Sequence, residues 1–159
     1  MADITYRPER VLPTIRQQLR AFIGMSAWEV LSKEWVDWAT DPSQQHADPT
    51  FDWFPENIGS YWDRHVQIDV VALNWQEKRL LLGECKWQPD PISRKVVKAL
   101  VEIKRVKLLT TFDDAENWRV AFACFARGGF TDAARQYAEQ QRVELVDLER
   151  LDRDLGTIC

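Results

Sequence analysis

The order of helical and extended segments predicts a three-layer α/β domain, with a mixed central sheet of about four to five strands between helices. Two observations carry this prediction. Amphipathic segments open the chain and recur between extended segments, and the extended segments are apolar on both faces, as in strands covered on two sides. The 159 residues are enough for one domain, expected to span residues 1–159, and 45% apolar residues with eight Trp exclude a disordered chain.

The first third of the chain is expected to be helical, at about residues 11–39. Gly24 is predicted to divide this segment into two helices or one bent helix. Ser26 would cap the second part, with Glu29 three positions on, as in a capping box. One apolar stripe at three- and four-residue spacing follows, formed by Trp28, Leu31, Trp35 and Trp38.

A proline-containing polar loop, residues 41–55, leads into the section expected to form the sheet. Strands are predicted at 58–62, 67–75 and 79–87, and the short polar link 76–78 predicts a hairpin between the last two.

Helices and strands are then expected to alternate to the end of the chain. A helix is predicted from Pro91 to about Leu109, a strand at 118–126, a helix at 132–141 capped by Thr131, a strand at 143–146 and a helix at 147–155. The expected core stripe of the helix after Pro91 is Ile92, Val96, Ala99, Ile103 and Val106.

The hairpin carries the residues that point to chemistry. If Gln76 and Glu77 are its turn residues, Asp69 lies opposite Glu84, and facing like charges are destabilising. A divalent cation between them would remove the repulsion. Lys86, two residues past Glu84, emerges on the same face. This register is an assumption, because the turn could be longer; the structural alternative is an ion pair of Asp69 with Lys86 at the sheet edge, with Glu84 solvated.

An aspartate followed by Glu-x-Lys on the next strand suits phosphodiester hydrolysis. The carboxylates would hold Mg²⁺, which polarises the scissile phosphate and lowers the pKa of a bound water. The ammonium of Lys86 would orient that water or stabilise charge in the transition state.

The sequence resembles the PD-(D/E)XK, or restriction-endonuclease-like, superfamily, and within it the C-terminal nuclease-like domain of archaeal-type ATPases. Four segments carry the resemblance: GMSAWE at Gly24–Glu29, IGSYWD at Ile58–Asp63, IDVVAL at Ile68–Leu73 and GECKW at Gly83–Trp87. Two positions depart from those domains, since Gln67 stands where they often have an acid and Ser60 where they often have a basic residue.

The resemblance implies a catalytic core at about residues 56–147 and a set of site residues. Asp69, Glu84 and the backbone carbonyl of Cys85 would hold Mg²⁺ or Mn²⁺, Lys86 would be the catalytic lysine, and Glu29 the accessory acid, with Glu56 as the alternative third acid. It further implies DNA as the substrate and allows an ATPase domain or protein, or a second copy of the chain, as a partner.

The charge distribution separates into unlike parts. The net charge of −4 excludes binding of DNA through bulk positive charge. Residues 29–56 hold seven acids and one lysine, whereas residues 88–107 hold six basic residues and two acids. Arg94, Lys98 and Arg105 fall in one sector of the predicted helix, where they form either a phosphate-binding ridge or an ordinary solvated face.

The remaining features weigh less. His46 and His65 share no metal-ligand spacing, and Trp62 and Trp87 flank the hairpin, where they serve either packing or base stacking. Three cysteines without a Cys-x-x-Cys pair favour a reducing compartment and a cytoplasmic protein, and no apolar run is long enough to span a bilayer.

Two functions are therefore carried forward. The first is a Mg²⁺-dependent deoxyribonuclease. The second is a non-catalytic nucleic-acid-binding or regulatory module that partners an ATPase.

Overall fold

A five-stranded mixed sheet organises the chain, of which the computed structural model describes residues 8–43 and 51–156. Its strands lie in sequence order: β1 (Asn57–Trp62), β2 (Gln67–Asn74), β3 (Arg79–Lys86), β4 (Arg119–Ala126) and β5 (Val143–Asp147). The β1–β2 and β2–β3 pairs are antiparallel, and the β3–β4 and β4–β5 pairs are parallel. This confirms the predicted mixed sheet.

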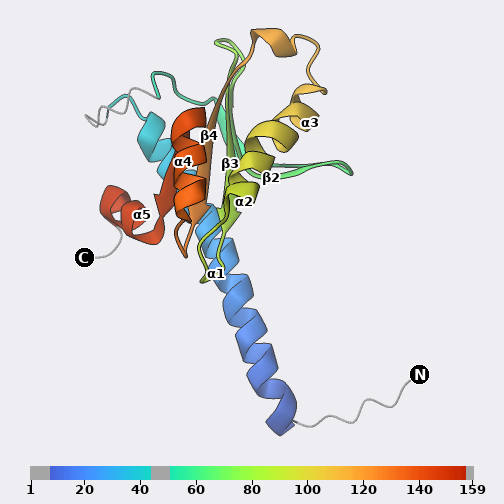
Figure 1. Ribbon diagram of the computed structural model, residues 1–159, viewed down its shortest axis with the longest axis vertical. Helices are drawn as coiled ribbons and strands as arrows, with labels where there is room; N and C mark the ends of the chain where they lie inside the picture. Colours follow the sequence, from blue (N-terminus) through green and yellow to red (C-terminus); the bar gives the residue numbers. More distant parts are fainter. Residues whose placement is uncertain (1–7, 44–50, 157–159) are drawn as a thin grey trace.

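Helices cover both faces of this sheet and complete the three layers (Figure 1). They are α1 (Pro8–Thr40), α2 (Arg94–Ala99), the π-helix η1 (Leu100–Lys104), α3 (Arg105–Leu109), the short 3₁₀ helix η2 (Ala115–Asn117), α4 (Asp132–Gln141) and α5 (Leu148–Leu155). The helices α1 and α5 pack on one face, and α2 to α4 on the other. Among the described helices, none combines the length and the apolarity that a membrane crossing needs.

Each face of the sheet has its own hydrophobic core. On the α1 side, Trp28 and Trp35 are fully buried against Leu81 and Phe125 of the central strands. The indole Nε1 of Trp28 donates a hydrogen bond to the carbonyl of Phe125 over 3.0 Å, so its polar atom is satisfied inside the core. The predicted tryptophan stripe is confirmed as the buried face of α1.

The helix α1 runs unbroken through Gly24, so the first of the two predicted alternatives, two separate helices, is wrong. A Cβ atom at Gly24 would lie 2.1 Å from the indole Nε1 of Trp87. The glycine therefore allows the close approach of Trp87 to the helix. The capping role predicted for Ser26 is wrong for the same reason, because Ser26 lies inside the helix.

The helical segment after β3 begins at Arg94 rather than at Pro91. Ile92 instead forms a parallel bridge with Phe130, and its amide donates to the carbonyl of Gly129 over 2.9 Å. The expected core stripe, which included Ile92 as a helical residue, is therefore partly wrong. Ile103 and Val106 are 52% and 53% exposed, and the buried residues of the segment are Val97, Leu100, Val101 and Leu108.

The C-terminal elements follow the prediction closely. The side chain of Thr131 accepts a hydrogen bond from the amide of Ala134 and caps α4, as expected. Asp147 caps α5 in the same way, by accepting from the amide of Arg150 over 2.8 Å.

Candidate active site

The β2–β3 hairpin has the predicted register over the pairs from Asn74–Arg79 to Val70–Gly83. The ladder stops there, one residue short of the predicted Asp69–Glu84 pair. Beyond Gly83, β3 continues only beside β4, where Glu84 pairs with Cys124. The two strands thus part at the position of the two carboxylates.

A β-bulge in β2 determines where Asp69 points. Gly59 pairs with Val71 and Tyr61 pairs with Ile68, so Asp69 and Val70 together face Ser60 alone. The hydroxyl of Ser60 donates to the carbonyl of Asp69 over 2.8 Å, which satisfies this backbone oxygen in the bulge. Bulges re-aim side chains, and they are common beside active sites.

The carboxylate of Asp69 bridges the gap between the two strands. Its Oδ2 accepts a hydrogen bond from the backbone amide of Cys85 over 2.9 Å. The Asp69 side chain therefore lies beside the residue that follows Glu84, and only 7% of Asp69 is exposed. The thiol of Cys85 belongs to the core on the α1 side, and burial raises its pKa.

Glu84 is buried, with 6% exposure, and lies between two lysines. Its Oε1 is 3.4 Å from the Nζ of Lys86, and its Oε2 accepts from the Nζ of Lys104 over 2.5 Å. The Lys86 contact agrees with the prediction that the two residues share a face. The structural alternative, a solvated Glu84 beside an Asp69–Lys86 pair, is contradicted by this burial and by the pairing of Lys86 with Glu84.

Lys104 is the site residue that the sequence analysis missed. It ends the π-helix η1 and lies on the buried side of the segment, between Leu100 and Leu108. A lysine on a buried stripe needs an acidic partner. With the stripe assigned correctly, this spacing would have pointed to Lys104. The wider turn of a π-helix is itself frequent at functional sites.

The carboxylates of Asp69, Glu84 and Glu29 lie close enough at this end of the sheet for their charges to interact. Burial is the largest cause that raises the pKa of Asp69, and the charges of Glu84 and Glu29 raise it further, against the amide of Cys85 and the ammonium of Lys104. Glu29 on α1 and Asp69 also line one cavity of about 150 Å³. The predicted accessory acid is thus near the pair. Glu56 is not, because its Oε1 accepts from the amide of Gln76 at the hairpin turn.

The residues present fit a divalent cation of the Mg²⁺ type. Asp69 and Glu84 offer the hard oxygen donors that such cations prefer, and both carboxylates are buried where the β2–β3 ladder ends. Within residues 8–43 and 51–156, no group of three or more His, Cys, Asp or Glu is arranged to hold a metal. Mg²⁺ usually takes only one or two carboxylates and completes its shell with water and substrate phosphate, so a pair is sufficient.

The predicted basic ridge is exposed, and two of its three residues contact partners other than the two buried carboxylates. The guanidinium of Arg94 lies 5.2 Å from the ring centre of Tyr137 on α4, and Lys98 pairs with Glu102 on its own helix at 3.8 Å. Arg105 is exposed. A phosphate-binding role for these three residues stays a prediction.

The two flanking tryptophans differ sharply. Trp87 packs on Trp28, with ring centres 5.6 Å apart, and under the guanidinium of Arg127 at 4.6 Å. Trp62, by contrast, is 74% exposed. Of the two histidines, His46 lies outside the described residues, and His65 is in the β1–β2 turn, where its carbonyl accepts from Lys107 over 3.1 Å.

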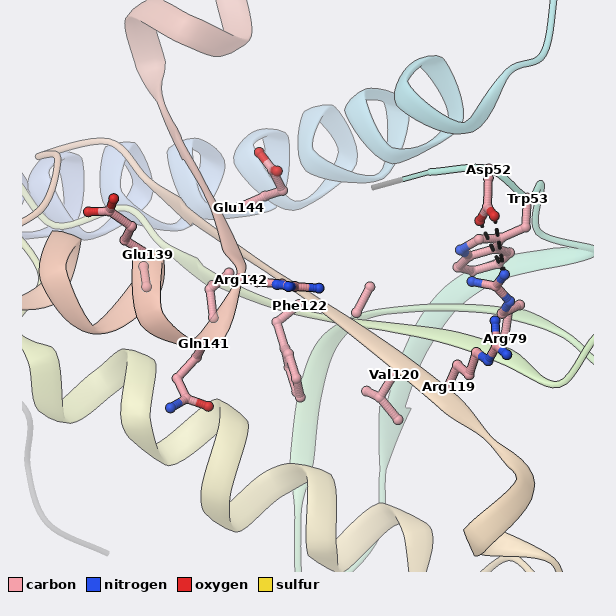
Figure 2. A pocket seen from close by; sticks show the side chains of 13 residues that line it. Asp52, Trp53, Arg79, Arg119, Val120, Phe122, Glu139, Gln141, Arg142 and Glu144 are labelled. Atoms are coloured by element: carbon pink, nitrogen blue, oxygen red, sulfur yellow. Dashed lines mark hydrogen bonds and ion pairs between the residues drawn. The ribbon is translucent and has the colours of Figure 1, made fainter. Parts of the chain in front are cut away.

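A larger cavity, of about 770 Å³, lies at the other end of the sheet (Figure 2). Arg79 and Arg119, the first residues of β3 and β4, line it together with Arg142, and Asp52 pairs with Arg79 at 3.2 Å. None of the predicted catalytic residues lines this cavity. Its size alone therefore does not identify the reactive end of the molecule.

Comparison with known proteins agrees with the geometry at β2 and β3. A family model described as "Restriction endonuclease" matches residues 60–155, which include Asp69, Glu84 and Lys86. The chain belongs to the restriction endonuclease family. A second model, described as "Archaea bacterial proteins of unknown function", matches residues 2–106, so this family member also belongs to that group, as expected for a domain of the archaeal ATPase-associated type.

Two individual proteins are similar to this restriction-endonuclease-like chain. An uncharacterized protein of Methanocaldococcus jannaschii is 38% identical over 61 residues, which cover 38% of this chain and 14% of that protein. A repair endonuclease from Pyrococcus abyssi is 13% identical, with a TM-score of 0.41 and coverage of 93% of this chain and 49% of that one.

Proposed function

We propose that the chain hydrolyses phosphodiester bonds of DNA with the help of a divalent cation. The observation that carries the proposal is the parting of β2 and β3 at Asp69 and Glu84, two buried carboxylates with lysines beside them. A structural role alone gives no reason to bury two like charges at one strand end. Membership of the restriction endonuclease family supports the same reading.

Each residue has a distinct part in the proposed reaction. Asp69, Glu84 and the backbone carbonyl of Cys85 would hold Mg²⁺ or Mn²⁺, and the amide of Cys85 fixes the orientation of the Asp69 carboxylate. The cation, when bound, polarises the scissile phosphate and lowers the pKa of a coordinated water. Lys86, on the same face as Glu84, donates to the phosphate oxygen or orients the attacking water. Glu29, which lines the cavity beside Asp69, would act as the accessory acid and accept a proton there.

Cleavage of plasmid and forked DNA with Mg²⁺ or Mn²⁺ tests the proposal. We expect Asp69→Asn, Glu84→Gln and Lys86→Met each to reduce cleavage by about 100-fold or more, the size seen when a charge-stabilising group is removed from an active site. Glu56→Gln is the matched control, because this acid lies at the hairpin turn. Wild-type protein that cleaves no DNA, or Asp69→Asn that cleaves normally, would refute the proposal.

One specific observation, the neutralisation of Glu84 by Lys86 and Lys104, favours a second function. A carboxylate already paired with two ammonium groups suits a non-catalytic module that docks DNA or an ATPase through its basic helix. This alternative predicts no binding of Mn²⁺ at millimolar concentration in titration calorimetry. It also predicts that Arg94→Glu with Lys98→Glu abolishes docking while Asp69→Asn does not.

A further inference from the structure

The most exposed aromatic residue beside the site is Trp62, the last residue of β1. Its side chain is 74% exposed, although burying an indole is strongly favourable. Trp62 nevertheless lines the same small cavity as Glu29 and Asp69. An indole left in solvent at the mouth of a site has a face available to a flat ligand.

The turn that carries Trp62 is firmly built. Asp63 accepts hydrogen bonds from the hydroxyl of Tyr61 and from the amides of His65 and Val66, at 2.7–2.8 Å. Its own amide donates to the carbonyl of Val66 over 3.0 Å. These bonds hold the turn in one conformation, so the exposure of Trp62 is a property of the fold.

The β1–β2 turn also carries an exposed basic side chain. Figure 1 shows the end of the β1–β2 pair that carries this turn extending beyond α3. Arg64 is exposed in the turn, and the ammonium of Lys107 on α3 binds the carbonyl of His65 at its base. The oxygens of Asp63 are already occupied by the turn. An exposed indole face gives an unpaired base a surface to stack on, and Arg64, two residues along the chain, is an exposed basic side chain that can pair with a phosphate.

We propose that Trp62 stacks on an unpaired base next to the scissile phosphate, so that the chain prefers DNA with single-stranded or forked segments over continuous duplex. Bases inside a duplex are stacked on each other and offer no free face, whereas an unpaired base does. This inference rests on the proposed action on DNA and adds the class of DNA structure.

Fluorescence anisotropy with three labelled DNAs tests the inference: a duplex, the same duplex with a forked end, and a single strand. Ca²⁺ replaces Mg²⁺ so that binding is measured without cleavage. Trp62→Ala should weaken binding to the forked and single-stranded DNAs by about 5- to 150-fold, the range expected for one lost base stack, and duplex binding by less than about 2-fold. Trp62→Phe, which keeps an aromatic face, should retain most of the affinity.

Trp75→Ala is the matched control, since Trp75 is also exposed, at 54%, but lies at the turn between β2 and β3, where it packs on Phe112 and Trp118. Binding of Trp62→Ala equal to wild type, or weakened equally on all three DNAs, overturns the stacking role. Failure of the wild type to bind any of the three DNAs instead overturns the proposed function, and the stacking role with it. A 2-aminopurine base at the fork gives an independent readout, because its fluorescence should be quenched by wild type and not by Trp62→Ala.

Discussion

Replacing Lys104 by Met tests whether this lysine neutralises Glu84. The substitution keeps a long flexible side chain and removes the ammonium that lies 2.5 Å from Glu84 Oε2. Without a cation, the buried carboxylate would then face only Lys86, at 3.4 Å and with its own side chain 37% exposed. We expect Lys104→Met to destabilise the fold in EDTA.

The magnitude follows from the burial of the pair. Loss of one partner of a fully buried ion pair costs about 3–5 kcal/mol, and loss of one hydrogen bond to a charged group about 1.5–3 kcal/mol. Because Lys86 stays in place and the Lys104 side chain is 24% exposed, the lower range applies. For a chain of this length, about 1.5–3 kcal/mol corresponds to a fall in Tm of about 3–12 °C.

Urea unfolding followed by circular dichroism, in EDTA and then in Mg²⁺, measures the effect. Mg²⁺ should stabilise Lys104→Met more than wild type, because the cation takes the place of the lost ammonium. Lys98→Met is the control: its partner Glu102 is 3.8 Å away with both side chains about half exposed, and such surface pairs contribute at most about 1 kcal/mol. Glu84→Gln added to Lys104→Met should recover part of the loss. The reasoning is refuted if Lys104→Met loses no more stability than Lys98→Met.

Three further outcomes follow from the packing and the charges. Gly24→Ala should lower the free energy of unfolding by about 1–3 kcal/mol, although alanine normally favours a helix, because its Cβ would clash with Trp87. Gly59→Ala is the control, since a Cβ at Gly59 would have no atom within 4 Å. Equal urea midpoints for the two variants would contradict this prediction. Because the pKa of Asp69 is raised in the folded protein, the free energy of unfolding in EDTA should fall as pH rises from about 4 through that pKa. Asp69→Asn should therefore be more stable than wild type at pH 7. A less stable variant would show that the ionised carboxylate does not destabilise the fold. Thr131→Ala should cost about 0.5–2 kcal/mol by removing the cap of α4; an unchanged Tm would show that the cap contributes nothing.

The strands and the core of the site could be predicted because they depend on nearby residues. Apolar runs and a short polar link define the β2–β3 hairpin, and its register then brings Asp69 toward Glu84 and Lys86. These relations span fewer than twenty residues along the chain. No distant part of the molecule has to be known in order to see them.

The features that were missed depend on contacts between distant segments. The sequence alone suggests that Gly24 interrupts the helix. The structure shows that glycine is needed there because the indole of Trp87, far along the chain, lies where a Cβ atom would be. The bulge that turns Asp69 toward Cys85 requires the pairing of β1 with β2. Lys104 lies on the helical stripe of Leu100 and Leu108, and only the packing of this segment on the sheet shows that this stripe is buried while Ile103 and Val106 are exposed.

The division of the sheet into two cores has a consequence for how this fold can change over evolution. Asp69, Glu84 and Lys86 belong to neither hydrophobic cluster, so they contribute little of the apolar burial that holds the domain together. Isosteric amide replacements of the two acids would leave both cores intact. If the proposed chemistry is present, a lineage can lose it in one or two substitutions and keep the scaffold.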